Sequence, residues 1–176
     1  TFNNITSDIG VTIRLSTSTG IVGAAAPAAS IPANWTNTTG LTTSAFNIIS
    51  SNITGKDFGI EQLPNTDDVS APSQNNPSGT TTVEVAPLSG NDAEDGTLGT
   101  GKSFKITTLP SNGTLYYNGV ALIAGEIISN YDPTKLTLDP NDGSITVSFT
   151  YVAIDMAGKE DSTHATVTMP FTTSTI

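Results

Sequence analysis

The feature that most constrains the fold is a period-two alternation of apolar and polar residues in the C-terminal part of the chain. Ile145, Val147, Phe149 and Tyr151 alternate with serine and threonine residues. Because successive side chains of a β-strand point to opposite faces of a sheet, this pattern predicts a strand with one buried face and one face in water. The same alternation predicts further strands at Val83/Val85, Phe104/Ile106, Leu115/Tyr117, Leu136/Leu138 and Val167/Met169/Phe171.

Turn-forming residues separate these apolar runs. The dipeptide Asn118-Gly119 accepts the positive φ angles of a type I′ turn and therefore predicts a two-residue hairpin. About seven short strands, with a turn roughly every 8–12 residues, are typical of an antiparallel sandwich of the immunoglobulin type. No window of the sequence shows the periodicity of an amphipathic helix.

The composition of residues 63–80 divides the chain. Residues 63–79 hold three Pro, three Asn and almost no side chain that could be buried, which predicts an extended linker at 63–80. The linker separates a front segment, 1–62, from the sandwich at 81–176. The front segment has few apolar runs, so it is either a small sandwich or a truncated domain, and we favour the truncated domain. The expected fold class is therefore all-β, an antiparallel immunoglobulin/cadherin-like β-sandwich preceded by a smaller or truncated β module.

The charge and the absence of cysteine exclude several classes of protein. The chain has 6 Lys and Arg, 16 Asp and Glu, a net charge of −10 and no Cys. So few cations cannot form the basic stripe that neutralises nucleic-acid phosphates. A disulfide scaffold, a Cys-based zinc site and a thiol nucleophile are excluded as well. No apolar run approaches the roughly 18 residues that span a bilayer, so we expect no nucleic-acid partner and no membrane insertion.

Several motifs of the C-terminal segment occur in a recognisable order. An acidic turn, NDAEDG at 91–96, precedes PSNGTL at 110–115, and FTY at 149–151, DMAG at 155–158 and ATVT at 165–168 follow. In this order and spacing, residues 81–176 resemble the bacterial cadherin-like and immunoglobulin-like tandem repeats of large cell-surface adhesins, similar to those of gliding Bacteroidetes. The end of the front segment, NITGKDFGI at 52–60, resembles the last strand of the prealbumin-like modules found between such repeats.

The resemblance implies a structural role rather than catalysis. It implies a repeat segment of an extracellular adhesin or surface filament on the bacterial cell surface, acting as a stalk in cell-surface attachment or gliding motility. The implied partners are neighbouring repeats of the same chain, together with a surface polysaccharide or another surface protein. We expect no enzyme, because Asp161, Ser162 and His164 lie within four residues, whereas a catalytic triad converges from separate elements.

The acidic turns have two competing interpretations. Calcium takes six to eight oxygen ligands, largely from carboxylates and carbonyls. In the repeats that this segment resembles, the acidic turn and the Asp after the Phe-x-Tyr strand bind calcium, which implies Asp92, Glu94, Asp95 and Asp155 as ligands here. The sequence departs from those repeats in having Glu94 for a more usual Asp, and Met156 for a small polar residue. Alternatively, these acids lie at turns because their side chains accept hydrogen bonds from local backbone N–H groups.

A binding module is the alternative function. Such a module would recognise a carbohydrate or a protein through loops at one end of the sandwich and would need exposed aromatic residues. Trp35, Tyr116 and Tyr131 are the main candidates in a chain with only 6% aromatic residues. The stalk hypothesis instead predicts acidic clusters near the ends of the sandwich and no deep pocket.

Overall fold

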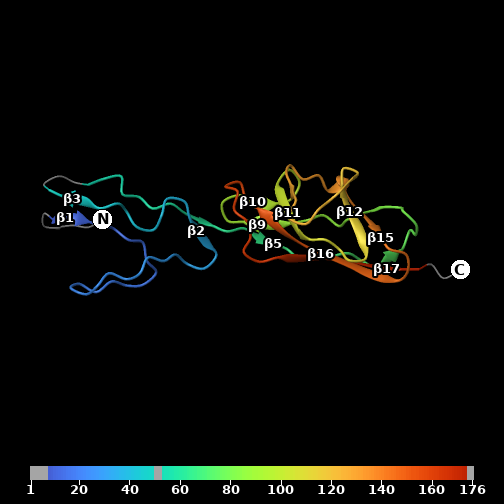
Figure 1. Cartoon of the computed structure of the whole chain (residues 1–176), viewed down its shortest axis with the longest axis horizontal. Helices are drawn as coiled ribbons and strands as arrows, with labels where there is room; N and C mark the ends of the chain where they lie inside the picture. Colours follow the sequence, from blue (N-terminus) through green and yellow to red (C-terminus); the bar gives the residue numbers. More distant parts are fainter. Residues whose placement is uncertain (1–7, 50–52, 174–176) are drawn as a thin grey trace. The chain divides into compact units, whose positions relative to one another are not determined.

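The computed structural model describes residues 8–49 and 53–173 and divides the chain into two units (Figure 1). Unit 1 is Thr1–Gln62 and unit 2 is Leu63–Ile176. The described residues form strands and one short 3-10 helix, η1 (Pro133–Lys135), with no α-helix among them. The expected all-β fold class is therefore confirmed.

Unit 1 is a small β module. In its described part, β1 (Asp8–Val11) pairs with β3 (Phe46–Ile48), and β2 (Trp35–Asn37) pairs with β4 (Ile60–Gln62), both antiparallel. The described hydrophobic side chains of this unit are half-buried or exposed, and none is fully buried. Two-stranded ribbons are marginally stable alone, so unit 1 has little of the packing that stabilises unit 2.

Unit 2 is a β-sandwich. Its larger sheet has the order β14-β11-β16-β17-β6, with β7 also paired to β17, and a second sheet has the order β13-β12-β15-β8. A three-stranded sheet, β10-β9-β5, lies at one end. The strands are β5 (Asn65–Thr66), β6 (Val69–Ser70), β7 (Gln74–Asn75), β8 (Val83–Glu84), β9 (Gly90–Asp92), β10 (Gly96–Leu98), β11 (Ser103–Thr108), β12 (Gly113–Tyr117), β13 (Val120–Ala121), β14 (Ile127–Ile128), β15 (Leu136–Pro140), β16 (Ile145–Ile154) and β17 (Ala165–Thr172).

The core of unit 2 forms from the alternation predicted in the sequence. Buried side chains of β11 and β16 on the larger sheet contact those of β12 and β15 on the second sheet in one hydrophobic cluster. Burial of a large apolar side chain contributes about 1.5–3 kcal/mol. The predicted hairpin is confirmed as well, because Asn118 and Gly119 have φ of 51° and 79° and Tyr117 pairs with Val120.

The structure corrects the predicted linker at 63–80. Within this segment β5 pairs with β9, and β6 and β7 both pair in parallel with β17. The backbone N–H of Ala71 donates to the Thr168 carbonyl at 2.9 Å, and that of Asn76 donates to the Thr172 carbonyl at 2.8 Å. A largely polar composition does not prevent backbone pairing, so this segment becomes an integral edge of the sandwich with only Val69 and Ala71 packed against the core.

Tyr151 anchors the same segment from the core. Its hydroxyl donates to the carbonyl oxygens of Asp67 at 2.6 Å and Ser89 at 3.0 Å, and accepts from the Ser89 N–H at 3.2 Å. The ring is fully buried. Burial raises the pKa of Tyr151 to about 12.

Replacement Tyr151→Phe is expected to lower the free energy of unfolding by about 1–3 kcal/mol, because the buried backbone groups lose their partner. Denaturant titration of the full chain measures this loss. Tyr116→Phe is the matched control, since Tyr116 is half-buried and makes no hydroxyl hydrogen bond within the described residues. Equal effects of the two replacements would contradict the anchoring role.

The raised pKa also predicts a pH dependence. Folding favours the neutral phenol, because the pKa of Tyr151 rises from an ordinary value of 10.0 to about 12. The resulting stability is fully present below pH 10 and is lost as the pH rises towards 12. The difference in unfolding free energy between the wild type and Tyr151→Phe should therefore narrow over that range. A constant difference would show that the hydroxyl does not titrate in this way.

Candidate metal centre

Two acidic turns meet at one end of unit 2. Asp92 closes β9 and begins the turn to β10, and Asp155 follows directly after β16. The Asp95 carboxylate joins the turns, because its Oδ2 accepts a hydrogen bond from the Met156 N–H at 2.6 Å. Residues that are about sixty positions apart in the sequence are therefore neighbours, as the calcium hypothesis requires.

One oxygen of each buried aspartate stabilises its own turn. Asp92 Oδ1 accepts from the backbone N–H groups of Glu94 and Asp95, both at 2.9 Å. Asp155 Oδ1 accepts from the Lys159 N–H at 2.7 Å. These are the local hydrogen bonds from backbone N–H groups to side chains that the turn interpretation predicts.

The other oxygen of each aspartate lacks a hydrogen-bond partner among the residues that the structure describes. Asp92 and Asp155 are only 8% and 5% exposed, and their Oδ2 atoms are buried without a hydrogen bond. A buried carboxylate oxygen left unpaired is costly, and a bound cation is one way to offset that cost. The two interpretations of the sequence are therefore compatible, since one oxygen serves the turn and the second is left for a ligand.

The remaining two predicted ligands are less favourable. Glu94 is exposed, and Asp95 is half-buried with one oxygen already bonded to Met156. Across residues 8–49 and 53–173, no three acidic or histidine side chains form a group that could hold a metal. A calcium ion here would therefore take most of its oxygens from backbone carbonyls and water, with Asp92 and Asp155 as the carboxylate ligands.

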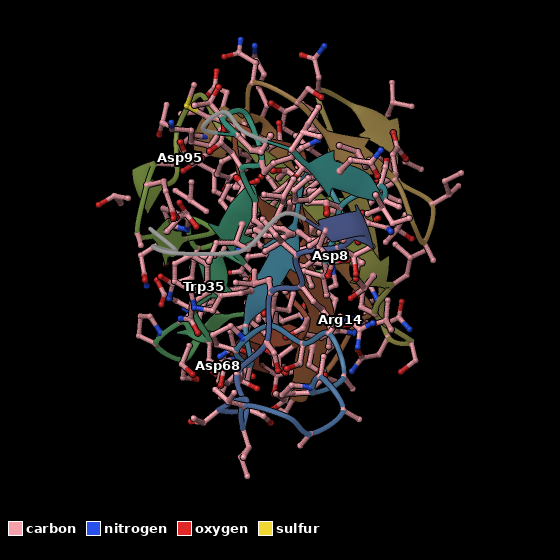
Figure 2. The ribbon with its side chains drawn as sticks, turned by 90° about the vertical axis from the view of Figure 1, so that its left-hand side faces the viewer. Asp8, Arg14, Trp35, Asp68 and Asp95 are labelled. Carbon is pink, nitrogen blue, oxygen red and sulfur yellow. The ribbon has the colours of Figure 1, made fainter. Side chains whose placement is uncertain are left out.

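The candidate centre adjoins the segment by which the chain enters unit 2. β5 pairs with β9 beside Asp92, and the Thr66 side chain of β5 accepts from the Ala153 N–H at 2.9 Å. We call this the proximal end of unit 2. Asp68 lies well apart from Asp95 (Figure 2), and instead accepts from the Thr166 N–H at 2.7 Å.

Asp161 has a role that the sequence does not indicate. Its Oδ2 accepts from the Thr66 N–H at 2.6 Å, and its Oδ1 accepts from the N–H and hydroxyl of Thr163. The residue is buried, whereas the neighbouring His164 is exposed. No local motif reveals this contact, because Thr66 lies 95 positions away.

One of the candidate aromatic residues of the binding alternative, Tyr131, lies in the core of unit 2. Tyr131 is 1% exposed and packs edge-on against Phe104 at 5.1 Å between ring centroids. Its hydroxyl accepts from the Leu88 N–H, and burial raises its pKa. Tyr131 is therefore a core residue, and it is not an exposed aromatic side chain of the kind that the alternative binding module would need. Trp35 and Tyr116 are half-buried and belong to different units.

Comparisons with known proteins leave the chain without an assigned family. No family model matches it, no curated protein matches it, and no solved structure matches it. Among the described residues, no helix has the length and apolar character needed to cross a bilayer. The functional argument therefore rests on the geometry of the strands and the acidic turns.

Proposed function

We propose that unit 2 is a load-bearing structural module of an extracellular bacterial adhesin or surface filament. In this role the module transmits tension between neighbouring repeats of the same chain during cell-surface attachment or gliding motility. The surface location rests on the sequence resemblance to adhesin repeats. The mechanical role rests on how the first and last strands of unit 2 are joined.

The chain enters and leaves unit 2 at opposite ends (Figure 1). Thr66 lies beside Ala153, near the end of β16, whereas Phe171 pairs with Ile145 at its start. The intervening strand of 10 residues is about 30 Å long at roughly 3.3 Å per residue. Modules with this arrangement extend a chain when they are joined end to end.

The parallel pairing of the terminal strands is the observation that carries the proposal. β6 and β7 are the first strands of the larger sheet in the sequence, β17 is the last, and both pairs run parallel. A force that pulls the two ends apart slides these strands along each other. The bonds at Ala71 and Asn76 then share the load, instead of breaking one after another.

The calcium proposal complements this role. Asp92 and Asp155 would hold the ion at the proximal end, where β5 and β9 pair. When bound, the ion would neutralise their charges and cross-link the two acidic turns. Hydrogen bonds within the protein already hold the segment that enters unit 2. The Ala153 N–H donates to the Thr66 hydroxyl, and the Thr66 N–H donates to the Asp161 carboxylate.

Single-molecule force spectroscopy tests the load-bearing role. The chain has no Cys, so cysteine handles can be placed at chosen positions. Handles at Leu63 and Thr173 load the terminal strands in shear and should require a several-fold higher unfolding force than handles at Gly143 and Thr173. The second pair lies at one end of the β16–β17 hairpin, where bonds break in sequence. Similar forces in both geometries would contradict the proposal.

Calcium binding has its own test. Millimolar Ca²⁺ should raise the unfolding temperature of unit 2 by several degrees, because a ligand that binds only the folded state stabilises it. Asp92→Asn and Asp155→Asn keep the Oδ1 acceptor but remove the anionic oxygen, and each should abolish most of this shift.

Asp139→Asn is the matched control for the calcium experiment. It removes one negative charge from β15, away from the acidic turns, and should leave the calcium response unchanged. Calorimetry with Ca²⁺ and Mg²⁺ completes the test. The absence of both a temperature shift and a binding heat would remove calcium from the account and leave the mechanical role standing.

A further inference from the structure

The two methionine residues of the chain lie in opposite environments. Met169 is 1% exposed in the core of unit 2, whereas Met156 is 74% exposed in the turn after β16. Peroxides oxidise methionine at its thioether sulfur, so the access of the oxidant to that sulfur decides which residue reacts. The fold therefore presents one methionine to an oxidant and shields the other.

A lysine ammonium contacts the exposed sulfur. Lys102 Nζ donates to Met156 Sδ at 3.4 Å. The backbone of Lys102 is held in the loop between β10 and β11, because its N–H donates to the Gly99 carbonyl at 3.0 Å and its carbonyl accepts from the Tyr131 N–H at 2.9 Å. The backbone of Met156 is held as well, since its N–H donates to the Asp95 carboxylate at 2.6 Å. The ammonium and the sulfur are thus brought together by two anchored turns that lie 54 positions apart.

We propose that Met156 is a site of selective oxidation by hydroperoxides, with Lys102 as the proton donor of the reaction. The sulfur lone pair attacks the outer oxygen of the hydroperoxide, so an S–O bond forms and the O–O bond breaks. The departing oxygen takes a proton from the Lys102 ammonium and leaves as an alcohol, or as water when the oxidant is hydrogen peroxide. The oxygen bound to sulfur then returns its own proton to the Lys102 amine. The sulfur is oxidised to the sulfoxide, the peroxide is reduced, and the lysine is regenerated.

Exposure alone also permits oxidation, because water can donate the same proton. The Lys102 ammonium adds a donor that is already in place beside the sulfur, and a positive charge beside the oxygen that becomes negative as the O–O bond breaks. Lys102 should therefore speed the oxidation of Met156 beyond what exposure gives. This role is independent of calcium binding and of mechanical load.

Oxidation also changes the contact between the two turns. A thioether sulfur is a weak hydrogen-bond acceptor, whereas a sulfoxide is polar, and bonds from a charged donor are stronger than those between neutral groups. The Lys102 ammonium would therefore hold the oxidised side chain of Met156 more firmly than the reduced one. The same oxygen on the buried Met169 would disrupt the core. Methionine sulfoxide reductases reverse the modification.

Peptide mass mapping of the folded 176-residue chain in dilute hydrogen peroxide tests the selectivity, with EDTA present to prevent metal-catalysed oxidation. Met156 should gain one oxygen atom, while Met169 stays unmodified. In denaturant, which removes the shielding, the two residues should react at similar rates. Oxidation of Met169 in the folded chain as fast as that of Met156 would overturn the proposal.

Three variants separate the effect of Lys102 from that of exposure. Lys102→Leu keeps an aliphatic side chain but removes the proton donor, and should slow the oxidation of Met156 several-fold. Lys102→Arg keeps a cationic donor and should retain most of the wild-type rate. Lys159→Leu is the matched control, because it removes the same charge three positions from Met156 and should leave the rate unchanged.

Two further measurements complete the comparison of the variants. Thermal unfolding verifies that each variant is folded, and the oxidation rate of Met156 in denaturant should be the same in all of them. An unchanged rate in folded Lys102→Leu would overturn the proposal. So would an equal loss of rate in Lys159→Leu, because a general effect of positive charge would then replace the proton donor.

Discussion

Unit 2 depends on the parallel pairing of its N-terminal segment with β17. Hydrogen bonds from Ala71 and Asn76 close the edge of the larger sheet, so β17 is not an open edge that could pair with another chain. Side chains from distant parts of the sequence hold the same segment, since Asp161 accepts from Thr66 and the Tyr151 hydroxyl donates to Asp67. The first and last strands are thereby fixed to each other, and this joint gives the proposed mechanical role its physical basis.

The buried acids at the proximal end differ in how their oxygens are satisfied. Both oxygens of Asp161 accept hydrogen bonds, so this residue is a structural anchor. Asp92 and Asp155 are as deeply buried, yet each keeps one oxygen without a hydrogen-bond partner within residues 8–49 and 53–173. An unpaired oxygen in a low-dielectric site lowers stability, and the proposed calcium ion would offset that cost at these two residues.

The sequence predicts the parts of the fold that depend on local patterns. Alternation places β16, β11 and β15 correctly, and Asn118-Gly119 identifies a hairpin through its backbone preference. The segment 63–80 is missed because its composition is that of a linker, while its partners lie on β17 and β9, far away in the chain. Composition reports what can be buried and does not report which backbone groups will pair.

The candidate metal centre is likewise only partly predictable from the sequence. Its residues are suggested by motif, and the structure joins the two turns through Asp95 and Met156. Which carboxylate oxygen is buried and unpaired depends on tertiary packing, so the sequence cannot separate Asp92 and Asp155 from the exposed Glu94. The sequence likewise does not identify Tyr131 as a core residue, because its burial against Phe104 follows from the closure of two sheets.

Amide hydrogen exchange at Ala71 and Asn76 tests the central claim most directly. If the N-terminal segment is an integral strand of the sandwich, these two amides should exchange only on global unfolding, with the same opening free energy as Ile106 in the core. Fast exchange at Ala71 and Asn76 beside a protected Ile106 would show that the segment detaches freely, and would contradict the account.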